Sequence, residues 1–137
     1  MKKVSRRSFL EKSSMVLASA AAITAIPASA QAAQAPSMFV HHVYFWLKNP
    51  SSKPDHAKLL KGLQSLTSIE AIKTSHIGVP ADTNRPVIEK SYQFSLLLIF
   101  NNRQDQDTYQ THPTHLKFVE DCSNLWTKVI VYDSVNA

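Results

Sequence analysis

The chain has 137 residues, with 15 lysines and arginines against 10 acidic residues, which gives a formal net charge of +5. Residues 1–30 hold five of these basic residues and one acidic residue, so the rest of the chain has ten and nine and is close to neutral. A nucleic-acid-binding domain needs a basic surface on its folded part, and this distribution argues against such a partner. Cys122 is the single cysteine, which excludes an internal disulfide.

Residues 1–30 have the organisation of a cleavable export signal. A basic start precedes a weakly hydrophobic run, Met15–Ile26, and the small residues Ala28-Ser29-Ala30. The run is shorter than the ~20 residues of a membrane span, so we expect no stable membrane anchor. Ser5-Arg6-Arg7-Ser8-Phe9-Leu10 resembles the twin-arginine consensus. The resemblance implies transient contact with the Tat translocase, cleavage after Ala30, and a periplasmic or secreted product. An ordinary secretory signal is the alternative.

Residues 31–37 are expected to form a flexible lead-in to one domain at residues 38–137. Met38–Lys48 is dense in β-branched and aromatic residues and predicts a strand. Side chains alternate along a strand, so this one has two distinct faces. One face carries Phe39, His41, Val43, Phe45 and Leu47, and the other carries Val40, His42, Tyr44 and Trp46.

The middle of the chain predicts a helix and two strands. Pro54 suits the first turn of a helix that ends near Ser68, with leucines at helical spacing between them. Ala71–Val79 predicts a second strand, and Ala81–Pro86 a polar turn. Ser91–Asn101 predicts a third strand that is apolar on both faces.

The last third predicts two helices and a closing strand. Gln104–Thr111 indicates a short helix, and Pro113 starts another. The expected strand is Lys128–Val135. A lone cysteine in a helical apolar pattern is typical of a core residue, and an intermolecular disulfide is the alternative for Cys122. The buried stripe of the second helix is expected at Leu116, Val119, Cys122 and Trp126.

The order β-α-β-β-α-β, with the second helix broken in two, predicts an α+β fold. It indicates a ferredoxin-like protomer in which helices cover one face of an antiparallel four-stranded sheet. The first and third strands are apolar on both faces, which is typical of a sheet buried on both sides. A second copy would supply the missing cover, so we predict a homodimer through the sheet face.

Six histidines are many for this length, and two groups stand out: His41-His42, and His112 with His115. His56 and His76 are interpreted as surface residues. Pro113 places His112 at a helix cap and His115 in the first turn, where the helix dipole disfavours protonation. A neutral imidazole can act as a general base, and the Tyr109 hydroxyl can donate a hydrogen bond to an oxyanion.

Three interpretations of this second group stay open at this point: helix capping, a polar ligand pocket, and a metal site. His-x-x-His with no clear third ligand is a weak metal signal. The chain has two glycines, Gly62 and Gly78, and no nucleotide-binding glycine motif. We therefore expect neither a metal nor a cofactor.

Three segments together resemble the stress-responsive α/β barrel family, also called Dabb. They are Met38–Val43, the pattern Tyr109…His112-Pro113-x-His115-x-x-Phe118, and Trp126…Val131-Tyr132-Asp133. The similarity runs from about Met38 to Asp133. It implies a ferredoxin-like protomer and a dimeric α/β barrel.

Relatives in that family include plant polyketide cyclases, in which a Tyr and a His close a ring by aldol chemistry without a cofactor. The resemblance implies Tyr109 and His115 for these catalytic roles and His42 for a pocket histidine. Phe94 stands where that cyclase has a further pocket histidine, so the cyclase's substrate is not carried over.

Three functions follow as alternatives. The first is a module that binds a small apolar or aromatic molecule between sheet and helices, with a role in stress as one option. The second is a cofactor-independent enzyme, polyketide cyclase-like or another lyase or isomerase, that uses Tyr109 and His115. The third is a structural dimer without a ligand. A shared cavity requires His42, Tyr109 and His115 to converge. Its expected ligand-binding residues are His42, Tyr44, Trp46, Phe94, Leu96 and His112.

Overall fold

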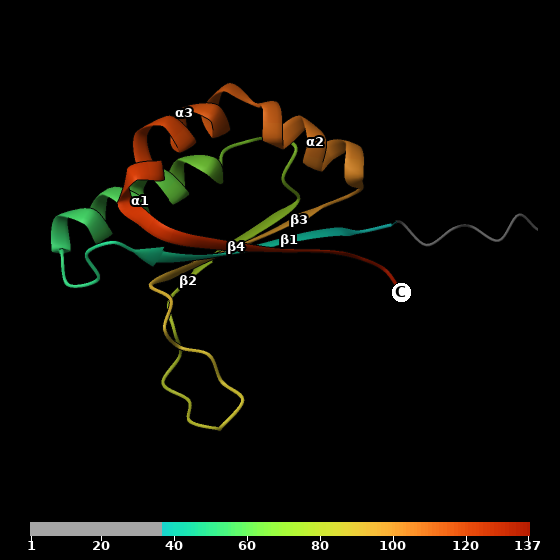
Figure 1. Cartoon of the computed structure of the whole chain (residues 1–137). Coiled ribbons are helices and arrows are strands. Elements are labelled where there is room, and N and C mark those ends of the chain that lie inside the picture. Colours follow the sequence, from blue (N-terminus) through green and yellow to red (C-terminus); the bar gives the residue numbers. More distant parts are fainter. Residues whose placement is uncertain (1–36) are drawn as a thin grey trace, which may run out of the picture. The chain divides into compact units, whose positions relative to one another are not determined.

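The computed structural model describes residues 37–137, and its elements follow the predicted order (Figure 1). The Arg6-Arg7 pair and the cleavage position after Ala30 lie outside the described residues. The elements are β1 (Phe39–Leu47), α1 (Lys53–Leu66), β2 (Thr74–Gly78), β3 (Phe94–Phe100), α2 (Arg103–Thr111), α3 (Pro113–Cys122), the short 3-10 helix η1 (Ser123–Leu125) and β4 (Trp126–Val135).

The four strands form one antiparallel sheet in the order β2-β3-β1-β4. The three α-helices lie on one side of this sheet, and the long connection between β2 and β3 extends on the other side (Figure 1). This is the predicted α+β, ferredoxin-like topology. No helix within residues 37–137 is long and apolar enough to cross a membrane.

The two faces of the sheet have different surroundings. Every second residue of β1, from Phe39 to Leu47, is buried, and the residues between them are partly exposed. The buried set packs in one core with Leu59, Leu63 and Leu66 of α1, so we call this side the helix-covered face. The opposite side, the open face, carries Val40, His42, Tyr44 and Trp46 with their neighbours on the adjacent strands.

Side chains cap the start of each α-helix. Ser52 accepts a hydrogen bond from the backbone N–H of Asp55, and Asn102 accepts one from Asp105. His112 caps α3, because its Nδ1 accepts from the N–H of Thr114 at 3.1 Å. The His112 backbone N–H also closes α2 on the Tyr109 carbonyl at 3.1 Å. One residue therefore ends the helix of Tyr109 and begins the helix of His115.

The prediction for the last helix was wrong in part. α3 ends at Cys122, and Trp126 begins β4 instead of extending the helical stripe. Leu116 and Val119 are 57% and 39% exposed rather than buried. The reason is that α3 turns Phe118 and Cys122 toward α1, where a Cβ on Gly62 would lie 2.8 Å from the Cys122 sulfur. This orientation leaves Leu116 and Val119 on the other flank of α3.

Candidate functional site

A cluster of aromatic and imidazole rings surrounds Tyr109 on the helix-covered face. The Tyr109 side chain comes from the last turn of α2 and is almost fully buried. Its ring centroid lies 4.6 Å from that of His115 on α3 and 5.9 Å from that of His41 on β1. Phe100 of β3 packs against the same ring at 5.4 Å. Four elements thus hold one phenol between two imidazoles.

Hydrogen bonds fix the orientation of both imidazoles. His41 Nδ1 lies 2.6 Å from Oδ1 of Asp133 on β4, and His115 Nδ1 lies 3.0 Å from the Gln110 carbonyl oxygen. Both partners accept, so each Nδ1 carries the proton, and each Nε2 keeps its lone pair when the ring is neutral. Neither of these two hydrogen bonds uses an Nε2 atom.

Burial sets the protonation of this cluster. It raises the pKa of Tyr109 far above its usual value of 10.0, so the phenol stays protonated at neutral pH. Burial also lowers the pKa of His115 from 6.5; the Gln110 carbonyl acts in the opposite direction, and His41 adds a smaller lowering. The cluster therefore presents a hydrogen-bond donor beside a neutral imidazole that can accept a proton.

His42 does not join this cluster, so the predicted convergence of His42, Tyr109 and His115 was wrong. His42 lies on the open face, opposite Leu97 of β3 and Tyr132 of β4. Burial lowers the pKa of His42 most, and the charges of His76 and His41 lower it further. His41 is the histidine of β1 that reaches Tyr109, because alternation places it on the buried side. The sequence holds no signal for this choice, because both faces of β1 carry apolar residues.

The other expected ligand residues are divided among separate places. Tyr44 and Trp46 lie on the open face, whereas Phe94 and Leu96 lie in the core on the helix-covered face. Phe94 is six residues from Phe100 along β3, or ~20 Å at the rise of a strand. Phe94 lines a cavity of about 520 Å³ together with His56 and Leu60 of α1. His112 is half-buried and serves as the cap described above.

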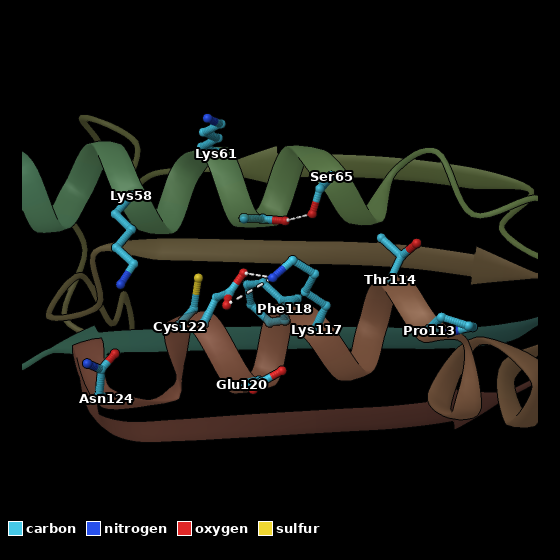
Figure 2. Close-up of a pocket in the computed structure, with 12 residues that line it drawn as sticks. Lys58, Lys61, Ser65, Pro113, Thr114, Lys117, Phe118, Glu120, Cys122 and Asn124 are labelled. Atoms are coloured by element: carbon cyan, nitrogen blue, oxygen red, sulfur yellow. Dashed lines mark hydrogen bonds and ion pairs between the residues drawn. The ribbon is translucent and has the colours of Figure 1, made fainter.

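A groove of about 900 Å³ lies between α1 and α3 (Figure 2). Lys117 is bonded to Asp121 across one turn of α3 at 3.0 Å, and the Cys122 sulfur points toward α1. Burial raises the pKa of this thiol, which keeps it protonated. Cys122 therefore behaves as a core residue. Within residues 37–137 no three His, Cys, Asp or Glu side chains form a group that could hold a metal ion.

Comparisons with known proteins agree on family and fold. The family model described as "Stress responsive A/B Barrel Domain" matches residues 39–136. None of the curated proteins matches this sequence. A ferredoxin-like Dabb family protein from Mesorhizobium loti superposes with a TM-score of 0.62 at 24% identity, over 74% of this chain and 98% of that one.

Two further solved structures are similar. A dimeric ferredoxin-like protein of unknown function from Thermobifida fusca has a TM-score of 0.61 at 14% identity, over 73% of this chain and 92% of the other. A hydroxynitrile lyase from Passiflora edulis has a TM-score of 0.62 at 17% identity, over 75% and 96%. At these identities the likeness shows the fold alone.

Proposed function

The chain belongs to the Stress responsive A/B Barrel Domain family, and from that premise we propose an exported homodimer that binds a small apolar or aromatic molecule beside Tyr109. The observation that carries the proposal is the ring cluster itself. A buried phenol lies between two imidazoles whose Nδ1 atoms are already bonded to Asp133 and Gln110. A ligand with a polar group that reached this cluster would meet the phenol and the Nε2 atoms of both rings.

Exposed apolar side chains beside the cluster suit the body of such a ligand. β4 is an edge strand, and on its helix-covered side Val129 and Val131 remain 43% and 45% exposed. Leu116 and Val119 are exposed on the flank of α3 away from α1. Binding sites for small molecules combine apolar walls with a few oriented polar groups. An apolar molecule covering these side chains would place its polar end near His115.

The homodimer is proposed through the open face. Val40, Leu97 and Ile99 are only partly buried in a single copy, which favours cover by a second sheet. Export is proposed from the Arg6-Arg7 signal in the sequence. Light scattering of the exported domain should give twice the mass of one chain, and a monomer at micromolar concentration would rule out the dimer.

The binding proposal is tested by removing the hydroxyl oxygen of Tyr109. A panel of apolar phenols and aromatic ketones is screened against the full chain by thermal shift, and hits are measured by calorimetry. Tyr109→Phe removes the hydroxyl and should weaken binding about tenfold, the value of roughly one hydrogen bond. Tyr132→Phe is the matched control, because Tyr132 is 62% exposed on the open face. Equal affinity in both variants would place the ligand elsewhere.

Proton transfer is the second candidate, and the His41–Asp133 pair favours it. The Asp133 carboxylate, 2.6 Å from His41 Nδ1, orients this imidazole beside Tyr109. The Passiflora edulis neighbour is a lyase by name. The readout is exchange of an acidic C–H of a bound ketone into deuterium oxide, followed by NMR. Loss of exchange in His115→Gln with ligand affinity retained would support catalysis, whereas unchanged exchange would exclude His115 as the base.

A further inference from the structure

A second cluster of aromatic rings lies on the open face, on the opposite side of the sheet from Tyr109. Tyr44 of β1 contacts Tyr92 edge-on at 4.9 Å between centroids and Tyr132 of β4 at 6.0 Å. Trp46 contacts Tyr92 at 6.3 Å. These four rings, together with Glu89, line a cavity of about 290 Å³. We call this set the aromatic cage.

Hydrogen bonds attach the loop side of the cage to the sheet. The Trp46 indole N–H donates to the Ser91 hydroxyl at 2.8 Å, and the Ser91 backbone N–H donates to the Glu89 carboxylate at 2.6 Å. The bonds from Ser91 lower the pKa of Glu89, so the carboxylate is ionised at neutral pH. The cage thus combines the negative faces of aromatic rings with the Glu89 carboxylate, and the Lys128 ammonium adjoins both.

The charge distribution of this site fits a positively charged ligand. Aromatic faces attract ammonium groups through their quadrupole, and indole does so most strongly. The chain already shows the effect, because the Lys128 ammonium lies 4.3 Å from the centroid of the Trp46 ring. Burial raises the pKa of Tyr44, so its phenol stays neutral and retains its hydroxyl proton. We propose that the aromatic cage binds the ammonium group of a small organic cation.

The position of the cage is compatible with a dimer through the open face. Trp46 is near the end of β1 and opposite Lys128 near the start of β4, so the cage lies at one end of the sheet. The row formed by His76, Leu97, His42 and Tyr132 crosses the middle of the open face, so the cage extends from that end of the sheet to this row through Tyr132. In a dimer that packs through the middle of this face, Trp46 and the loop residues Glu89 and Tyr92 would lie at the edge of the interface, which is why the test below also follows the oligomeric state.

The test uses choline and its neutral isostere 3,3-dimethyl-1-butanol, titrated into the full chain by calorimetry at low salt. Choline should bind about tenfold more tightly than the alcohol, because both have the same shape and one has the charge. Glu89→Gln keeps the hydrogen-bonding oxygen and should weaken choline about threefold. Trp46→Leu should weaken it about tenfold. Glu70→Gln removes an exposed carboxylate outside the cage and should leave affinity unchanged.

Three outcomes would overturn the proposal. Equal binding of choline and the alcohol would mean an apolar cavity without cation selectivity. Absence of choline binding at millimolar concentration would mean that no such site exists. Dissociation of the dimer by choline, measured by sedimentation, would mean that the rings belong to the subunit interface. Because the cage and Tyr109 lie on opposite faces, Tyr109→Phe should not alter choline affinity.

Discussion

Replacement of Gly62 by alanine tests the contact between α1 and α3. A Cβ at this position would lie 2.8 Å from the Cys122 sulfur and 2.9 Å from the Phe118 ring, closer than ordinary contact. Overpacking of this kind costs about 1–3 kcal/mol, whereas alanine in a helix gains about 1 kcal/mol over glycine. The net expectation is a loss of about 1 kcal/mol, equivalent to about 4–8 °C in Tm for a domain near 100 residues.

The assay is thermal and urea unfolding of Gly62→Ala, with exposed Gln64→Ala in α1 as the control for helix propensity. Cys122→Ala provides the second arm, because it removes the closest contacting atom. In that background the cost of Gly62→Ala should fall by about half, since the Phe118 contact remains. A rise in Tm for Gly62→Ala in the wild-type background would show that the two helices do not approach this closely, and would refute the reasoning.

Three further predictions concern protonation and export. Burial lowers the pKa values of His42 and His115 from 6.5. The neutral imidazoles therefore contribute stability above pH 6.5, and this contribution is lost as the pH falls through the lowered pKa values. The urea midpoint should therefore drop as the pH falls below 6.5, and less so in His115→Gln. The raised pKa of Tyr109 has the opposite effect on stability. The neutral buried phenol contributes stability below pH 10.0, and this contribution is lost at higher pH. Ultraviolet titration should show Tyr109→Phe lacking the last phenol to ionise. Lys-Lys in place of Arg6-Arg7 should retain folded precursor inside the cell, and normal export would exclude the twin-arginine route.

The fold was predictable because its signals are local and redundant. The alternation in β1 and the dense apolar run of β3 each identify a strand without knowledge of its partners. Pro54 and Pro113 mark the first turns of α1 and α3. The exposure of Leu116 was not predictable, because helical spacing gives a stripe but does not say which neighbour the helix packs against. That choice depends on the close approach at Gly62, a tertiary contact.

The contact between Tyr109 and His115, which are close in the sequence, was predictable, whereas the contacts of His41 with residues far away in the sequence were not. Tyr109 and His115 are close because His112 joins their helices, and that relation is visible in the sequence. The choice between His41 and His42 required the knowledge of which face of β1 the helices cover. Asp133 lies 92 residues from His41, and their pairing follows from the register of β1 with β4. No spacing rule within one strand supplies that register.

The double role of His112 limits how this family can vary in length. α2 and α3 share this single residue, so the connection has no spare backbone. One inserted residue would rotate α3 by about 100° relative to α2, because a helix has 3.6 residues per turn. His115 would then leave Tyr109, although both residues would still be present. The connection between β2 and β3, which extends away from the sheet in Figure 1, does not set the position of His115 relative to Tyr109. Insertions and deletions among relatives that keep the ring cluster should therefore gather in that loop and be rare at His112.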